Sequence, residues 1–98
     1  MKRTPYAVTA VFKTHPGGVE KMKQLIADVT APSLGEDGCI IYHWSQGEED
    51  PTWYFLYMNW RDRASFDAHV ASRHVKKAEA LLKDLLLEPS EELHWHRL

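Results

Sequence analysis

The sequence predicts an α+β protein in which one sheet of four antiparallel strands carries helices on one face. Three observations support this class. Strand-like and helix-like segments follow one another in the order strand, helix, strand, strand, helix, strand. A short polar turn joins the two middle strands, and right-handed crossovers in the two strand–helix–strand units place both helical regions on the same face. The expected architecture is a ferredoxin-like sandwich, built as a single domain over residues 1–98.

The first third of the chain is expected to form a strand and an amphipathic helix. Residues 6–14 alternate as a strand with both faces partly covered, and the motif HPGG at 15–18 ends that strand. Apolar residues then recur at helical spacing from Gly18 to about Ala31. Pro32 and the polar loop 35–38 should end this helix.

Two aromatic strands follow, over residues 39–46 and 52–60, joined by the turn-forming segment GEEDP. In the first strand one face is expected to carry Ile40, Tyr42 and Trp44. In the second strand both faces are apolar: one carries Tyr54, Leu56, Met58 and Trp60, and the other carries Trp53, Phe55, Tyr57 and Asn59. A lone chain would expose the second of these faces, so we expect a face-to-face homodimer.

The last third is expected to hold two helical stretches and a closing strand. Asp62 fits the N-cap of a helix that runs to about Val70. A second helical stretch ends near Pro89, and the segment ASRH at 71–74 is a candidate kink between the two. Residues 91–98 alternate again and should form the last strand.

The composition excludes several classes of function. The net charge is −2 with Lys and Arg spread through the chain, so we expect no nucleic-acid partner. No apolar run approaches the roughly 20 residues needed to cross a bilayer, and the N-terminus lacks a signal-peptide core. Cys39 is the single cysteine, so an internal disulfide is excluded. We expect Cys39 to be a small buried hydrophobic residue. We therefore expect a cytoplasmic protein without a membrane partner.

The candidate site lies between Tyr54 and His74, where an aromatic strand turns into a helix that carries histidines. The turn should let Trp60 and His69 line one concavity. His69 borders an apolar helical stripe, so it could titrate near neutrality and act as a base. From the residues alone, a partly buried structural histidine is the simpler explanation. The pattern does not separate binding from catalysis.

The remaining polar motifs predict no cofactor. His94 and His96 share one face of the last strand and could supply two metal ligands, but no third ligand is nearby in sequence, so we expect no metal site. His74 is expected to be a solvated or capping residue. The glycines at 17–18 lack the spacing of a phosphate-binding or dinucleotide-binding loop.

A set of motifs in fixed order extends the prediction. The chain carries Gly38-Cys39 with Tyr42, then Asp50-Pro51, then Trp60, then the segment SFDAH at 65–69. In their order and spacing these motifs resemble the antibiotic biosynthesis monooxygenase (ABM) domain family, and the resemblance covers nearly the whole chain.

The resemblance implies a ferredoxin-like dimer, often called a dimeric α/β barrel. It also implies oxidation of a small aromatic phenol or quinol by O₂ without metal or flavin, because the substrate supplies the electrons. His69 would be the base that removes a phenolic proton. The expected substrate contacts are Trp60, Asn59, Tyr57, Phe66 and His74, although strand periodicity places Asn59 and Tyr57 on the face opposite Trp60.

Two departures from the family pattern matter. Many relatives have Glu two residues before the Trp, where this chain has Met58. Haem-degrading relatives have Asn at about the position of Ala10, so haem degradation is not expected. A non-catalytic dimer that binds a small molecule, or an isomerase on the same fold, remains the alternative.

Overall fold

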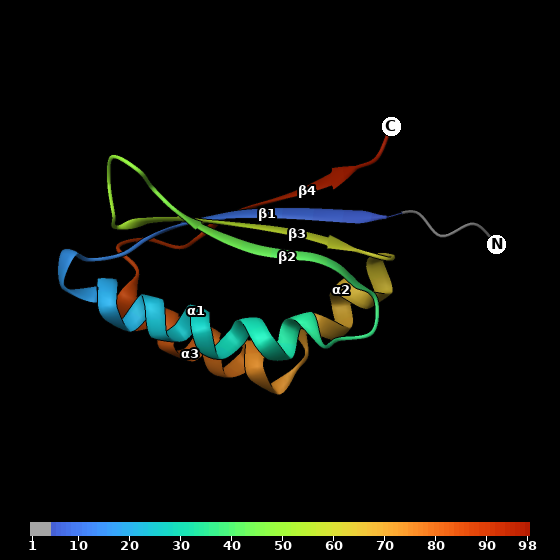
Figure 1. Cartoon of the computed structure of the whole chain (residues 1–98), viewed down its shortest axis with the longest axis horizontal. Helices are drawn as coiled ribbons and strands as arrows, with labels where there is room; N and C mark the ends of the chain where they lie inside the picture. Colours follow the sequence, from blue (N-terminus) through green and yellow to red (C-terminus); the bar gives the residue numbers. More distant parts are fainter. Residues whose placement is uncertain (1–4) are drawn as a thin grey trace.

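The computed structural model describes residues 5–98 and confirms the predicted fold class and element order. The elements are β1 (Tyr6–Lys13), the 3₁₀ turn η1 (Pro16–Gly18), α1 (Val19–Leu34), β2 (Cys39–Gln46), β3 (Trp53–Trp60), α2 (Arg63–Val70), α3 (Arg73–Leu85) and β4 (Glu91–His96). The sheet order is β2-β3-β1-β4 with every neighbouring pair antiparallel. All three α-helices lie on one face of this sheet (Figure 1). Residues 1–4, part of the segment in which we expect no signal-peptide core, lie outside the described residues.

Several element ends differ from the prediction: β1 ends at Lys13 rather than at residue 14, β3 begins at Trp53 rather than at residue 52, and α3 ends at Leu85 rather than near Pro89. Helix α1 runs past Ala31 and includes Pro32, because proline removes only one N–H and the final turn closes through Gly35 N–H to Ala31 O at 3.2 Å. Strand β4 ends at His96 rather than at residue 98. Its partner in β1 is Tyr6, and the residue before Tyr6 is a proline that cannot donate a ladder hydrogen bond.

The predicted cap and kink define two separate helices. Asp62 is confirmed as the N-cap of α2, since its Oδ1 accepts from Ser65 N–H at 2.9 Å. Where a kink was expected, the chain instead leaves helical geometry and Ser72 caps α3, accepting from Val75 N–H at 3.4 Å. This break brings the end of α2 next to the start of α3. None of the helices within residues 5–98 has the length and apolarity needed to span a bilayer.

The face of the sheet toward the helices forms the core. The side chains that alternate onto it from the two central strands are buried: Val8, Ala10 and Phe12 from β1, and Tyr54, Leu56, Met58 and Trp60 from β3. They pack against Met22, Leu25 and Val29 of α1 and Phe66 of α2. The predicted division of β3 into two faces is therefore confirmed.

One residue of β2 departs from the predicted alternation. Cys39 pairs with Trp60 and Ile41 pairs with Asn59, so Ile40 is the extra residue of a β-bulge. Ile40 is 54% exposed. The expectation that Ile40 shares a face of the strand with Tyr42 is wrong, because a bulge shifts the alternation of every residue before it.

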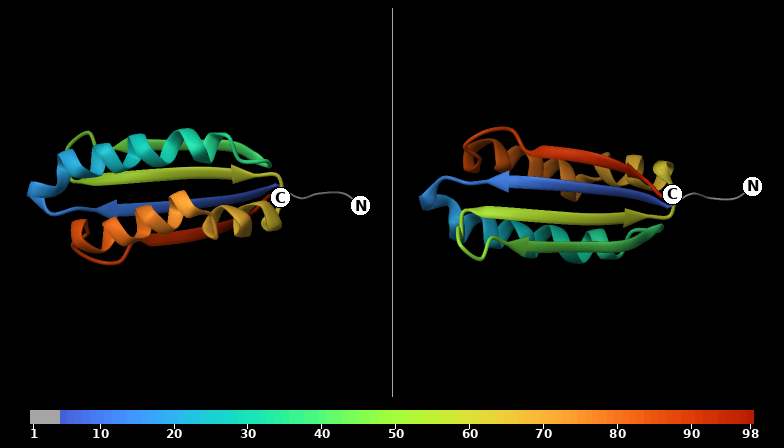
Figure 2. Two further views of the ribbon diagram at one scale, coloured as in Figure 1. Left: turned by 90° about the horizontal axis from the view of Figure 1, so that it is seen from below. Right: turned by 90° about the horizontal axis from the view of Figure 1, so that it is seen from above.

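The second face of the sheet is not covered by any helix (Figure 2, right). Large apolar side chains lie exposed on it: Trp53 at 45%, Phe55 at 42%, and Leu93 and Trp95 at 49% each. We call these four residues the open-face cluster. The predicted homodimer stays a prediction, but the surface that motivated it is present.

Candidate functional site

A cavity of about 510 Å³ lies between the covered face of the sheet and the helices. Aromatic rings of Phe12, Tyr42, Trp44 and Phe66 form much of its lining. Polar residues also line it: Glu79 of α3, Ser90 just before β4, and Glu92 within β4. An apolar cavity of this size with a few polar groups is typical of a small-molecule site.

His69 lies at the wall of this cavity and is only 4% exposed. The Asp62 cap starts α2 directly after β3, so the second turn of the helix projects His69 back onto the end of that strand. Its ring packs against the indole of Trp60 in a tilted arrangement, with 4.6 Å between the ring centroids, and makes an edge contact with the ring of Tyr42 at 5.6 Å. These contacts hold the imidazole ring in one orientation.

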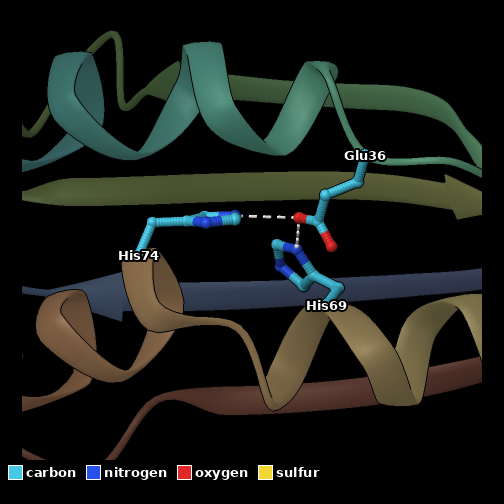
Figure 3. A group of neighbouring side chains, drawn as sticks. All are labelled: Glu36, His69 and His74. Carbon is cyan, nitrogen blue, oxygen red and sulfur yellow. Dashed lines mark hydrogen bonds and ion pairs between the residues drawn. The ribbon is translucent and has the colours of Figure 1, made fainter.

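A carboxylate completes the arrangement. Glu36 Oε2 lies 2.6 Å from His69 Nδ1 and 2.8 Å from His74 Nε2 (Figure 3). The three side chains come from the loop after α1, from α2 and from α3. An ionised carboxylate only accepts hydrogen bonds, so both imidazoles donate to it. With the proton of His69 on Nδ1, the neutral ring keeps its lone pair on Nε2.

Burial shifts the pKa values of His69, Tyr42 and Cys39. Desolvation lowers the pKa of His69 from its ordinary value of 6.5, against the opposing influence of the Glu36 hydrogen bond and charge, and His74 lowers it further. Burial likewise raises the pKa of the Tyr42 hydroxyl and of the Cys39 thiol, and the Glu36 charge adds to both shifts. At neutral pH His69, the Tyr42 hydroxyl and the Cys39 thiol are therefore all uncharged.

The other expected substrate contacts are only partly brought together. Phe66 lines the cavity beside His69. Trp60 is fully buried behind the His69 ring, so it supports the histidine but is not part of the cavity surface. His74 lines a neighbouring hollow of about 310 Å³ between α1 and α3.

Tyr57 and Asn59 do not reach the cavity. Both side chains belong to the open face, where they border a hollow of about 270 Å³ together with Ala7 and Trp95. Strand alternation places them there, as the sequence indicated. Neither residue lines the cavity between the sheet and the helices.

Sequence reasoning missed Glu36, which it treated as part of a turn. One signal could have found it. In the predicted hairpin the start of β2 lies beside Trp60 at the end of β3, and Glu36 is three residues before β2. Position 58 in β3, where the family pattern has a glutamate, holds Met58, whereas the carboxylate that orients His69 lies in the loop before β2.

The histidines of β4, His94 and His96, lie outside the cluster around Glu36. On the edge strand, His94 Nε2 lies 2.7 Å from Glu92 Oε2, and its Nδ1 accepts from the Tyr6 hydroxyl at 2.6 Å. Within residues 5–98, the one group of three or more His, Cys, Asp or Glu ligand atoms close enough to hold a metal ion is Glu36, His69 and His74. His94 and His96 are not part of it.

Comparison with known proteins agrees with the motifs. Residues 5–81 match the model of the family described as "Antibiotic biosynthesis monooxygenase". An uncharacterised protein of Synechocystis is 29% identical over 87 residues, which are 89% of this chain and 59% of that protein, so the chain spans less than two thirds of this relative. A protein of Mycobacterium tuberculosis named "Putative monooxygenase" is 29% identical over 88% of this chain and 84% of its own length.

The fold also matches solved structures. The crystal structure of a Pseudomonas aeruginosa protein superposes with a TM-score of 0.91 at 26% identity, covering 100% of this chain and 98% of that one. The resemblance deduced from Gly38-Cys39, Asp50-Pro51, Trp60 and the segment 65–69 is thereby confirmed.

Proposed function

The chain belongs to the antibiotic biosynthesis monooxygenase family, and from this premise we propose that it oxidises a small aromatic phenol or quinol with O₂ without a cofactor. Membership of the family and the name of the mycobacterial relative support a monooxygenase-like oxidoreductase. One observation carries the finer proposal. A buried, carboxylate-bound histidine stands at the wall of an aromatic cavity.

The first step is removal of a phenolic proton by His69. Glu36 accepts a hydrogen bond from Nδ1–H of His69, so the basic nitrogen is Nε2. Trp60 and Tyr42 hold the ring in place. The phenolate that results is electron-rich and can pass an electron to O₂. Glu36 and Trp60 are positioning residues in this scheme, and His69 is the catalytic residue.

The substrate supplies every electron the reaction needs. One oxygen atom of O₂ replaces a ring hydrogen and becomes a carbonyl, and the other leaves as water with the two hydrogens lost from the ring and the hydroxyl. A phenol and O₂ thus give a quinone and water. No external reductant is required, which is the chemical reason for proposing a cofactor-independent reaction.

The cavity favours a planar substrate. Its volume of about 510 Å³ falls in the range of small-molecule sites, and the rings of Phe12, Trp44 and Phe66 offer apolar faces to a fused aromatic system. A protein without a ligand would be expected to fill this space with side chains. The cavity therefore supports binding of a small molecule.

We propose that the working form is a homodimer that pairs two copies of the open-face cluster. That cluster exposes four large apolar residues on a face without helices. An isologous contact would cover both copies at once.

Oxygen uptake with a panel of naphthalene-type quinols tests the function. The His69→Ala variant should lose about 10²–10⁴-fold in kcat/KM, the usual contribution of a general base. The matched control is His15→Ala, which removes an exposed histidine whose side chain makes no capping hydrogen bond. Turnover of His69→Ala equal to that of the wild type would show that the base is wrongly assigned.

The alternative is a binding module or an isomerase that uses the same cavity without O₂. Met58 stands where many relatives have a carboxylate, which favours this alternative. Thermal stabilisation by an aromatic ligand, with no oxygen uptake in the presence of any quinol, would support this alternative and exclude the proposed monooxygenase activity.

A further inference from the structure

We propose that Glu36, His69 and His74 also form a binding site for a divalent transition-metal ion, and that an ion bound there switches off the base. The binding site is argued from geometry and ligand chemistry. The switch rests on the proposed function, because it requires His69 to act as a base.

The three ligand atoms are almost in place. One ligand atom from each of the three residues lies within 4.8 Å of the other two, and Glu36 Oε2 is 2.6 Å from His69 Nδ1 and 2.8 Å from His74 Nε2. In a tetrahedral site, metal–ligand bonds of about 2.0–2.2 Å place neighbouring ligand atoms roughly 3.3–3.6 Å apart. Side-chain movements of less than about 1 Å would make room for an ion in the centre of the group.

The ligand types select the class of metal. Two imidazole nitrogens and one carboxylate oxygen bind zinc and ferrous iron in sites that keep further positions open. Magnesium prefers oxygen ligands and is not expected there. A metal ion binds the unprotonated nitrogen of each imidazole, and the carboxylate of Glu36 supplies a negative charge that attracts a cation.

The site also has an entrance and a rigid frame. His69 is buried against Trp60, whereas His74 keeps part of its surface in the hollow between α1 and α3. The ligands come from three different segments, as Figure 3 shows, so an ion would join the loop after α1 to both α2 and α3. We therefore expect zinc to stabilise the fold as well as to bind.

Metal binding changes the tautomer of His69. In the metal-free protein Nδ1–H donates to Glu36, and Nε2 carries the lone pair. An ion on Nδ1 requires that nitrogen to be unprotonated, so the ring proton moves to Nε2. The proton is relocated and none is lost. Nε2 then donates a hydrogen bond and can no longer accept a phenolic proton, which is why an occupied site cannot start the reaction.

The test of the site is calorimetry of zinc binding to the untagged chain after removal of metals with a chelator. We expect one zinc ion per chain and no binding of magnesium. Glu36→Gln and His74→Gln should each lose the saturable zinc binding, because each removes one of three ligands. His94→Gln is the matched control, since His94 makes a similar 2.7 Å contact with a carboxylate outside the cluster.

Folding of each variant is checked by circular dichroism. Zinc should also raise the Tm of the wild type but not that of Glu36→Gln, which gives a second measurement on the same ion. The proposal is overturned if the wild type binds no zinc, if binding survives Glu36→Gln and His74→Gln, or if His94→Gln abolishes it.

The switch is tested by quinol-dependent oxygen uptake, with each protein compared with its own metal-free rate. Zinc should abolish turnover of the wild type, and a chelator should restore it. His74→Gln should keep its own rate when the same zinc is added. Zinc that binds without affecting turnover would refute the switch and leave the site standing. If no quinol is turned over, the proposed function and the switch both fail, while calorimetry still decides the metal site.

Discussion

Along β3, alternate side chains enter two very different surroundings. Leu56, Met58 and Trp60 face the helices and are buried, whereas Trp53 and Phe55 on the other side are 45% and 42% exposed. Both sets are equally apolar, so residue type does not distinguish core from open surface. The difference comes from coverage by α1, α2 and α3, which lie on one face alone (Figure 2). Large side chains on the uncovered face then point to a partner.

The same contrast separates the two histidine–carboxylate pairs. His69 and Glu36 approach to 2.6 Å beneath the helices, and His94 and Glu92 approach to 2.7 Å on an exposed edge strand. Contact length does not tell them apart. Burial does, because desolvation lowers the pKa of His69 and so favours its neutral ring, which lies at a cavity wall. A hydrogen-bonded histidine thus becomes a candidate base when it lies on the covered face.

The largest expected effect is a charge placed on the open face. Phe55→Lys should weaken the proposed dimer by roughly 100-fold or more, because each symmetric interface would receive two unpaired charges. Leu34→Lys, at an exposed leucine of α1, should leave the association unchanged. Sedimentation equilibrium measures both. A wild type that is monomeric at every concentration would contradict the prediction.

The next effect compares neighbours on opposite faces. Leu56→Ala should lower the free energy of unfolding by about 2–5 kcal/mol, since it leaves a cavity in the core. This loss should not vary with protein concentration. Phe55→Ala should mainly weaken the proposed dimer, so its effect on the free energy of unfolding should depend on protein concentration. Denaturant unfolding at several protein concentrations separates the two, and identical behaviour of both variants would show that the faces are equivalent.

A smaller effect concerns the helix that carries His69. Asp62→Ala removes the N-cap of α2 and should cost about 1 kcal/mol. Asp67→Ala is the control, because Asp67 lies exposed on the same helix and makes only a 3.9 Å surface ion pair with Arg63. Thermal unfolding measures both losses. Equal losses would mean that the cap does not hold α2.

The smallest effect lies at the hairpin tip, outside both faces. Hydrogen bonds from the Thr52 hydroxyl and N–H hold the pKa of Asp50 below its ordinary value of 3.8. The folded state therefore protonates Asp50 less readily than the unfolded state does. The ionised carboxylate stabilises the fold above pH 3.8, and this contribution to the free energy of unfolding is lost as the pH falls through the lower pKa of the folded state. Thr52→Val should reduce this acid sensitivity slightly. Thermal unfolding between about pH 5 and pH 2 would detect it, and an unchanged profile would contradict it.

Much of the fold was predictable because its signals are local. Alternation along 52–60, the turn GEEDP and the Asp62 cap each depend on a few neighbouring residues, and each is confirmed. Ile40 was misplaced because a β-bulge depends on how two strands pair, which alternation within one strand does not reveal. The extension of α1 through Pro32 has the same origin, in hydrogen bonds that residue preferences do not report.

The sequence by itself determined the fold class, the two apolar faces of β3 and the place of His69 beside an apolar helical stripe. These follow from backbone geometry, since side chains alternate along a strand and return every three or four residues along a helix. The tertiary structure alone decided that Glu36 is the partner of His69 and His74, which are 33 and 38 residues away along the chain. It also decided which face is covered and that Trp60 lies behind the histidine rather than in the cavity. Such contacts depend on how whole elements pack, and no local pattern encodes that packing.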